Sequence, residues 1–306
     1  MKYFIAIPTY NGGELWRSTV LNIKKYAPQD AQICIIDSSS KDDTVLLARN
    51  AGFVISTIPS VEFNHGGTRN KAILDFGSNN DIVIFLTQDA VPKAGFVEAI
   101  LAAFENEQVV CAYGRQLPHD DANPIAKHAR YFNYPDQSYT CGISDVPRMG
   151  LKTVFMSNSF SAYRLSEFRE LGGFPSDTIL CEDMYYTAKA VLAGYKVAYV
   201  HDALVAHSHY YSPFEEFKRY FDIGVFHTDE PWIRKAFGGA GGEGKKFILS
   251  ELFFLLRNNP LWIPIACINN LMKFLGYKIG QKYKKLPLSI IKKFSMHTRY
   301  WKDRIL

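Results

Sequence analysis

The chain has 306 residues, of which 47% are hydrophobic and 21% are charged. This composition excludes a disordered chain, and the length suits one α/β catalytic domain with an appendage. The formal net charge of +5 is unevenly distributed, because residues 245–306 have 13 Lys and Arg against two acidic residues, which leaves 22 basic and 28 acidic residues, a net −6, in residues 1–244.

Short apolar runs alternate with helical patterns in the first 90 residues. Such alternation predicts parallel βαβ units. Sheets of this kind bind ligands beyond the carboxyl ends of their strands, where this chain has Thr9, Asp37 and Asp89. The predicted strands are 3–8, 32–37, 53–58 and 81–86, and the predicted helices are 14–26, 41–51 and 67–76.

Beyond residue 100 the pattern is less regular. We predict strands at 109–114 and 153–163 and a helix over 182–193. Residues 212–215 (SPFE) have a capping-box pattern with proline at the first helical position, which predicts a second helix as far as residue 225. The phenylalanines of this helix either help to bind a substrate or belong to the core; they are Phe214, Phe217 and Phe221.

A glycine-rich segment and a basic tail complete the chain. Residues 238–244 predict a flexible loop. Residues 245–306 combine positive charge with large apolar side chains, which suits an anionic membrane surface better than a nucleic acid. Pro260 and Pro264 interrupt the apolar stretches, and a spanning helix needs about 20 mostly apolar residues, so surface attachment is favoured over crossing. A solvated helical face packed on the catalytic domain is the alternative.

The five cysteines are widely separated and form no CxxC motif or Cys/His cluster, which argues against a disulfide framework and a structural zinc site. The apolar run at the N-terminus is too short for a signal peptide. We therefore expect a reducing, cytoplasmic location.

Two strand ends carry residues suited to a nucleotide. Pro8-Thr9-Tyr10-Asn11-Gly12 forms a turn that offers backbone N–H groups and a hydroxyl, although such turns are common in α/β proteins. Asp37 in residues 35–40 (IIDSSS) either accepts the imide N–H of uracil or thymine or belongs to a helix N-cap run.

In order and spacing these motifs resemble the nucleotide-binding half of family 2 glycosyltransferases, which have the GT-A fold. The resemblance covers about residues 2–210 and comprises PTYNG, IIDSSSKDDT, Arg69-Asn70, Thr87-Gln88-Asp89 and Glu182-Asp183. Residues 63–70 (FNHGGTRN) and 86–90 (LTQDA) look like the bacterial rhamnosyltransferase subgroup, whose donor is dTDP-L-rhamnose. The resemblance implies an α/β fold of GT-A type with a mostly parallel central sheet, to which the chain adds a helical basic C-terminal appendage.

The resemblance also implies roles for residues that bind the donor. Thr9 and Asp37 would hold the base and ribose, and Arg69 would lie near the base or diphosphate, with an ordinary surface ion pair as the alternative for Arg69. The glycines of FNHGGTRN would permit close approach of the ligand. The other implied donor-binding residues are Tyr10, Asn11, Ser39, His65, Gly66 and Gln88.

A divalent cation, Mn²⁺ or Mg²⁺, is implied as well, because it offsets the negative charge of the departing diphosphate. Asp89 would bind it, although this chain has Gln88-Asp89-Ala90 where family members usually have two or three acidic residues. His207 or His209 would add a ligand; a lone histidine is more often a packed or surface residue.

An inverting transfer needs a base beside the acceptor hydroxyl, and the resemblance assigns this role to Asp183, with Glu182 orienting the site. The alternative is that acidic residues are favoured in any first helical turn. The helix N-terminus should lower the pKa of Asp183 and burial should raise it, so the sequence leaves the outcome open.

By resemblance, then, the chain is an inverting, metal-dependent enzyme that moves L-rhamnose from dTDP-β-L-rhamnose to a lipid-linked saccharide at the inner face of the cell membrane. The alternatives are a UDP-hexose donor or a non-catalytic membrane adaptor, and a dinucleotide-binding oxidoreductase is disfavoured because GxGxxG is absent after the first strand.

The predicted division is a catalytic domain at 1–237, with a donor half at about 1–115 and an acceptor half at about 116–237, a loop at 238–244 and a membrane-associating segment at 245–306. The sequence predicts no nucleic-acid partner and leaves the oligomeric state open.

Overall fold

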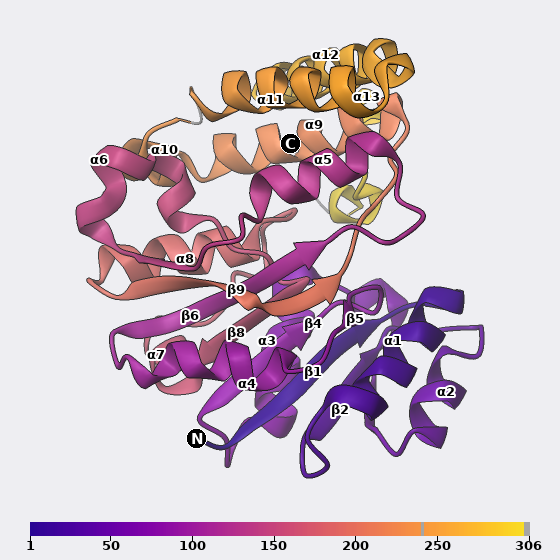
Figure 1. The fold of residues 1–306 in the computed structure, drawn as a ribbon, viewed down its shortest axis with the longest axis vertical. Coiled ribbons are helices and arrows are strands. Elements are labelled where there is room, and N and C mark those ends of the chain that lie inside the picture. The colour runs from indigo at the N-terminus through magenta and orange to yellow at the C-terminus, as the bar shows by residue number, and fades with distance from the viewer. Residues whose placement is uncertain (240–241, 303–306) are drawn as a thin grey trace. The chain divides into compact units, whose positions relative to one another are not determined.

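A computed structural model describes residues 1–239 and 242–302 of the chain, and Figure 1 shows its fold. Residues 240–241 of the predicted glycine-rich loop and residues 303–306 of the predicted tail lie outside the described residues. The chain forms two compact units. Unit 1 consists of Met1–His119, Tyr134–Ser176 and Glu182–His207, and unit 2 consists of Asp120–Asn133, Asp177–Cys181 and the described residues from Ser208 onward.

Unit 1 is built on a nine-stranded sheet of order β3-β2-β1-β4-β8-β6-β9-β5, with β7 also paired to β9. The pairs β1–β2, β1–β4, β2–β3 and β6–β9 are parallel, and β8 is antiparallel to β4 and β6. Six strands, β1 to β4, β6 and β9, therefore point the same way, which confirms the predicted mostly parallel α/β sheet. The strands are β1 Tyr3–Thr9, β2 Gln32–Asp37, β3 Val54–Thr57, β4 Ile82–Leu86, β5 Val91–Pro92, β6 Val109–Leu117, β7 Tyr139–Cys141, β8 Phe160–Arg164 and β9 Lys196–Ala206.

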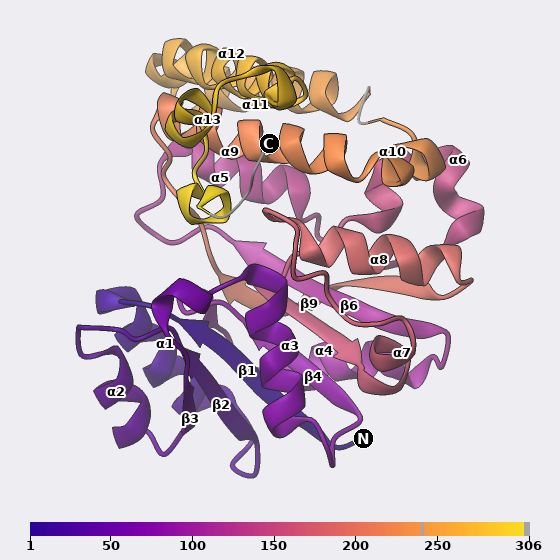
Figure 2. The ribbon, with the colours of Figure 1, turned by 180° about the vertical axis from the view of Figure 1, so that it is seen from behind.

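Helices cover both faces of this sheet, and strands buried on both faces are apolar at nearly every position. On one face Ile5 and Ile7 pack with Trp16 in the main core cluster, whereas Phe4 turns to the other face and meets Phe76. Figure 1 shows α1 and α4 in front of the sheet, and Figure 2 shows α3 on the opposite face. The helices of unit 1 are α1 Gly13–Tyr26, α2 Thr44–Asn50, α3 His65–Phe76, α4 Phe96–Ala102, α6 Val146–Met149, α7 Leu165–Glu170 and α8 Glu182–Leu192.

The strand predicted at 153–163 is wrong over residues 153–159. Gly150–Val154 is a 3₁₀ helix, and β8 begins only at Phe160. A turn separates the two, in which the backbone N–H of Phe160 donates to the carbonyl of Ser157 at 3.1 Å. The sequence analysis also missed β9, whose polar His201 and Asp202 interrupt the apolar pattern beside a register shift against β6.

Unit 2 consists of helices. The predicted capping box at Ser212 and Glu215 is present, because the Ser212 hydroxyl accepts from the backbone N–H of Glu215 while the Glu215 carboxylate accepts from that of Ser212. Phe217 and Phe221 are buried, whereas Phe214 is exposed. The helices are α5 Pro124–Asn133, α9 Pro213–Asp229, α10 Pro231–Phe237, α11 Glu243–Asn258, α12 Ile263–Gly280 and α13 Leu288–Phe294.

Helix α12 packs directly on the backbone of α9. A Cβ atom added at Gly276 would lie 2.2 Å from the Phe217 carbonyl oxygen, and one at Gly280 would lie 2.1 Å from that of Phe221. Only glycine permits so close an approach. Helix α12 of the predicted tail is therefore closely packed on α9, and the functional division predicted at residues 237 and 245 stays a prediction.

No helix among residues 1–239 and 242–302 is both long enough and apolar enough to cross a membrane.

Candidate active site

The loops after β1 and β2 are joined at Asp37. Thr9 and Asp37 are register partners at the ends of these strands, and Asp37 is 1% exposed. Its Oδ1 accepts from the Thr9 hydroxyl at 3.0 Å, and its Oδ2 accepts from the backbone N–H of Ser40 at 2.8 Å. Asp37 thus fixes both turns, as the position of a strand-end carboxylate predicts, and its contact with a base or ribose stays a prediction.

Gln88 holds the loop after β4 against the loop after β1. Its Oε1 accepts from the backbone N–H of Tyr10 at 2.8 Å, and its Nε2 donates to the Tyr10 carbonyl at 3.1 Å. This pairing uses both halves of the amide. A second carboxylate at position 88 could not make the donor half, which gives a structural reason for glutamine before Asp89.

Two residues predicted to bind the donor have left-handed backbone angles, φ 47° at Asn11 and φ 62° at Ser39. The Asn11 Oδ1 accepts from the backbone N–H of Lys41 at 2.8 Å, and the Ser39 hydroxyl donates to the Ile58 carbonyl at 2.8 Å. Such angles are unfavourable for residues other than glycine and occur preferentially at functional sites. Both strained residues lie where parallel strands present their carboxyl ends.

Asp89 and His207 face each other beyond the ends of β4 and β9, with Asp89 Oδ1 3.5 Å from His207 Nε2. Nδ1 of His207 lies 2.8 Å from Oε1 of Gln116, and Nε2 of Gln116 donates to the Ser157 hydroxyl at 2.7 Å, which turns the amide oxygen toward the ring. His207 therefore donates from Nδ1, and a neutral His207 presents the lone pair of Nε2 to the carboxylate. Two facing acceptors at this distance fit a cation, and a histidine ligand is typically oriented by a hydrogen bond at its other nitrogen.

The other histidine considered as a ligand, His209, comes two residues after His207 and belongs to unit 2. Its role as a ligand stays a prediction.

Glu182 and Arg69 form a buried ion pair, in which Nη1 of Arg69 lies 3.1 Å from Oε1 of Glu182 and the side chains are 6% and 5% exposed. Arg69 also donates to the carbonyl of His65 at 2.9 Å. Burial raises the pKa of Glu182, but the Arg69 charge and other nearby groups outweigh it, so that the pKa is lowered. Burial lowers the pKa of His65. Arg69 thus neutralises Glu182 inside unit 1, and its predicted contact with a diphosphate stays a prediction.

Asp183 is half-buried in the first turn of α8. Its Oδ1 accepts from the backbone N–H of Met184 at 2.7 Å, and its Oδ2 accepts from that of Asn158 at 3.1 Å. Burial and the charge of Glu182 raise the pKa of Asp183 to about 7, although these hydrogen bonds act in the opposite direction. Burial therefore prevails over the helix N-terminus. A partly exposed carboxyl that titrates near neutrality is suited to act as a general base at neutral pH.

Three consecutive residues before β8, 157–159, connect these clusters. Ser157 accepts the hydrogen bond that orients Gln116, and the carbonyl of Ser159 accepts from the backbone N–H of Thr87 at 3.2 Å, two residues before Asp89. The residue between them, Asn158, contacts both acidic residues of α8. The sequence analysis missed this segment because it assigned the residues to a strand. The signal was present as three short polar residues, Ser-Asn-Ser, inside an apolar run.

Asn158 positions Glu182 and Asp183 together. Its Nδ2 donates to Glu182 Oε1 at 2.8 Å, while its backbone N–H serves Asp183. The hydroxyls of Ser161 and Tyr163 donate to its Oδ1 at 2.8 and 2.7 Å, and the side chain is 4% exposed. Every polar group of the Asn158 side chain is thus engaged, and its amide has a single orientation.

The FNHGGTRN segment serves a structural contact with residues 173–175. The Asn70 side chain donates to the Phe174 carbonyl at 2.8 Å and accepts from the Phe174 N–H at 3.1 Å. A Cβ atom at Gly66 would lie 1.9 Å from the Pro175 carbonyl oxygen. Close packing on Pro175 therefore accounts for glycine at position 66, and contacts of His65 or Gly66 with the donor stay predictions.

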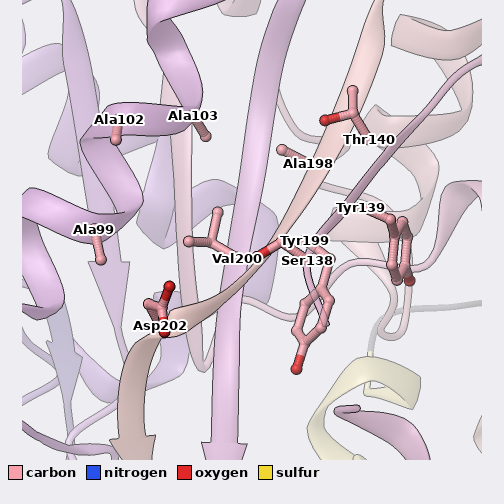
Figure 3. A pocket seen from close by; sticks show the side chains of 10 residues that line it. All are labelled: Ala99, Ala102, Ala103, Ser138, Tyr139, Thr140, Ala198, Tyr199, Val200 and Asp202. Carbon is pink, nitrogen blue, oxygen red and sulfur yellow. The ribbon is translucent and has the colours of Figure 1, made fainter. Parts of the chain in front are cut away.

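A cavity of about 540 Å³ lies elsewhere in unit 1, between α4, β9 and the residues around β7. Figure 3 shows that none of the predicted site residues is among those that line it. Its lining residues are Ala99, Ala102, Ala103, Ser138, Tyr139, Thr140, Ala198, Tyr199, Val200 and Asp202.

Comparison with known proteins gives matches over most of the chain. The family described as Glycosyl transferase family 2 matches residues 4–172. O-antigen chain rhamnosyltransferase RfbN of Salmonella typhimurium is 50% identical over 305 residues, which are 99% of this chain and 97% of that protein. O-antigen chain rhamnosyltransferase WbaN of Salmonella anatum is 50% identical over 304 residues, which are 99% of this chain and 96% of that protein.

Among solved structures, the mannosyltransferase PcManGT from Pyrobaculum calidifontis, in complex with GDP-Man and Mn²⁺, matches with a TM-score of 0.57. The alignment covers 98% of this chain and 84% of that one at 17% sequence identity. Similarity at this level concerns the fold alone, and it confirms the predicted GT-A type fold.

Proposed function

We propose that this chain, which belongs to glycosyl transferase family 2, transfers L-rhamnose from dTDP-β-L-rhamnose to a saccharide with inversion at the anomeric carbon. The chain is a glycosyltransferase. Identity of 50% over nearly the whole length to two proteins named O-antigen chain rhamnosyltransferases supports rhamnose as the sugar and O-antigen as the product class. The observation that carries the mechanism is the placement of the Asp183 carboxylate at the start of α8, beside Glu182 and held by the backbone N–H groups of Met184 and Asn158.

Asp183 is proposed as the base. As the acceptor oxygen forms its bond to the anomeric carbon, the hydroxyl proton passes to the Asp183 carboxylate and the sugar's bond to the diphosphate breaks. The backbone N–H groups of Met184 and Asn158 hold the carboxylate in place, and burial together with the charge of Glu182 raises its pKa to about 7. A base with this pKa is largely ionised above pH 7 and still basic enough to accept the proton.

Asp89 and His207 are proposed to hold a divalent cation, Mn²⁺ or Mg²⁺. The residues fit such an ion, because the carboxylate and the Nε2 lone pair converge and Gln116 fixes the ring. The cation supplies positive charge that offsets the charge on the departing diphosphate. A single carboxylate and an imidazole are a sparse ligand set, so we expect donor oxygens to complete it.

The donor is proposed to bind over the loops after β1, β2 and β4. Asp37 and Thr9 form the floor of these loops, and the strained Asn11 and Ser39 shape them. Gln88 ties the first loop to the one that carries Asp89. The nucleotide and the cation therefore share one hydrogen-bonded framework.

The acceptor is proposed to be a lipid-linked saccharide, which places the protein at the inner face of the cell membrane. The basic residues of 245–306 support contact with an anionic membrane surface. A UDP-hexose remains the alternative donor, since a carboxylate at Asp37 would accept from the imide N–H of uracil as readily as from that of thymine.

The test compares Asp183→Asn with Asp202→Asn, whose side chain is 75% exposed, in transfer assays with dTDP-rhamnose and with UDP-hexoses. We expect Asp183→Asn to reduce kcat by at least about a hundredfold and to keep affinity for dTDP in calorimetry. Asp202→Asn should leave both unchanged. Retention of transfer by Asp183→Asn would refute the base, and transfer from a UDP-hexose alone would refute the donor.

A further inference from the structure

The exposed apolar side chains of the described chain are concentrated in one hairpin of unit 2. Eleven of the 24 exposed large hydrophobic residues lie within residues 248–275, on α11, α12 and the 3₁₀ turn Pro260–Trp262 that connects them. Soluble proteins rarely expose apolar patches of this extent unless the patch binds something. We call this set the hairpin face: Ile248, Leu249, Leu252, Phe253, Leu256, Leu261, Ile265, Ile268, Leu271, Phe274 and Leu275.

The hairpin face is the side of each helix that no other helix of unit 2 covers. In α11 the covered side carries Leu255, which is fully buried in a cluster with Ile125 of α5 and Ala266 of α12. In α12 the covered side carries Gly276 and Gly280, which rest on α9. Figures 1 and 2 show α11 and α12 lying alongside each other. The connecting turn exposes 90% of Leu261.

Positive charge predominates among the residues that carry the hairpin face, and Glu243 at the start of α11 pairs with Lys246. Among the described residues from 244 to 302, every exposed charged side chain is positive, and the one acidic residue, Glu251, is buried. A second copy of the same face would bring positive charge onto positive charge, whereas an anionic lipid surface complements it. The exposed cations are Lys245, Lys246, Arg257, Lys278, Lys282, Lys284, Lys285, Lys293, Arg299 and Lys302.

We propose that the hairpin face lies in the interface of an anionic phospholipid bilayer, an inference that rests on the membrane acceptor of the proposed function and names the surface that meets the lipid. Leu261 at the turn and Phe253 on α11 enter the boundary between headgroups and acyl chains, and the surrounding lysines and arginines contact the headgroups. Helices with one apolar and one basic side bind in this manner without crossing the bilayer.

Flotation of the full-length protein with vesicles tests this inference. The wild type should float with phosphatidylcholine vesicles that contain phosphatidylglycerol and much less with phosphatidylcholine alone. Phe253→Ser with Leu261→Ser should weaken binding by roughly tenfold or more for each residue, because each buries a large apolar side chain in lipid. Both side chains are mostly exposed, so the fold should persist. The matched control is Leu21→Ser with Leu74→Ser, which are 64% and 82% exposed on α1 and α3.

Three results would overturn the inference. The first is equal flotation of the wild type and the Phe253→Ser, Leu261→Ser variant. The second is equal loss in the control pair. The third is a wild-type dimer without lipid that this variant converts to a monomer, which would assign the face to contact between copies. Transfer to a water-soluble acceptor separates this inference from the proposed function: the variant should keep it, and a wild type that floats without transferring rhamnose would refute only the function.

Discussion

The pKa of Asp183 predicts a steep dependence of transfer on pH. The perturbation is pH itself, because only the ionised carboxylate can accept the proton of the acceptor. An aspartic acid with its ordinary pKa of 3.8 would be ionised at every neutral pH, whereas the pKa of Asp183 is about 7. The ionised fraction is then about one half at pH 7, one tenth at pH 6 and one hundredth at pH 5. The rate should therefore fall on the acidic side of neutrality.

The assay is kcat/KM for the acceptor, measured with saturating donor and metal. We expect it to fall about a hundredfold from pH 8 to pH 5, with a half-maximal value near pH 7. Glu182→Gln removes a negative charge that raises the pKa of Asp183, so its half-maximal value should move to lower pH. A rate that stays constant from pH 8 to pH 5 would refute the burial argument. An acidic limb that Glu182→Gln leaves in place would assign the limb to another group.

Glu182→Gln needs its own control, because it leaves Arg69 buried without its partner. Removing one member of a buried ion pair typically costs about 3–5 kcal/mol of stability. The double variant Glu182→Gln with Arg69→Met removes both charges and should recover much of that loss. Thermal unfolding of both variants then separates an altered pKa from a damaged fold.

Three further predictions follow from single contacts. Gln116→Met removes the acceptor that orients His207, so its metal affinity should be about 10–100-fold lower. Titration of activity with Mn²⁺ or Mg²⁺ measures this affinity, and an unchanged titration would contradict the ligand assignment. Asn158→Asp keeps the acceptor oxygen but adds negative charge beside Glu182, so the acidic limb of the pH profile should move to higher pH; a shift to lower pH would refute the positioning role. Gly280→Ala should lower stability by about 1–3 kcal/mol in thermal denaturation, because its Cβ would lie 2.1 Å from a carbonyl oxygen, whereas Gly244→Ala in open space should not.

The fold was largely predictable because burial on both faces makes the strands of the sheet apolar and continuous. β1, β2 and β4 follow this rule, and Thr9, Asp37 and Asp89 lie at or just beyond their ends as parallel topology requires. β9 was not predictable in this way. Its polar residues His201 and Asp202 lie at an irregularity in the pairing with β6, and a hydropathy pattern cannot predict such an irregularity.

The candidate site was predictable where it consists of side chains at the ends of elements, and not where it consists of contacts between loops. Asn158 holds Asp183 through its backbone N–H and Glu182 through its side-chain amide, and no local sequence pattern predicts either hydrogen bond. The pKa of Asp183 likewise depends on burial and on Glu182 together, so its direction required the assembled unit. For Arg69 the residue type alone was misleading. An arginine suggested a phosphate contact, whereas its position in the fold makes it the ion-pair partner of Glu182.

The surroundings of Asp183 also bear on how the chain becomes active during folding. The Asn158–Glu182 hydrogen bond closes a loop of 24 residues, and the ion pair to Arg69 brings together helices much further apart in sequence. Closing such loops costs conformational entropy of the chain before the new contacts stabilise it, so we expect these contacts to form late in folding. A chain in which these contacts have not formed would have an ordinary, weakly basic carboxylate at position 183. Competence to consume an activated sugar is thereby deferred until the last long-range contacts of unit 1 are made.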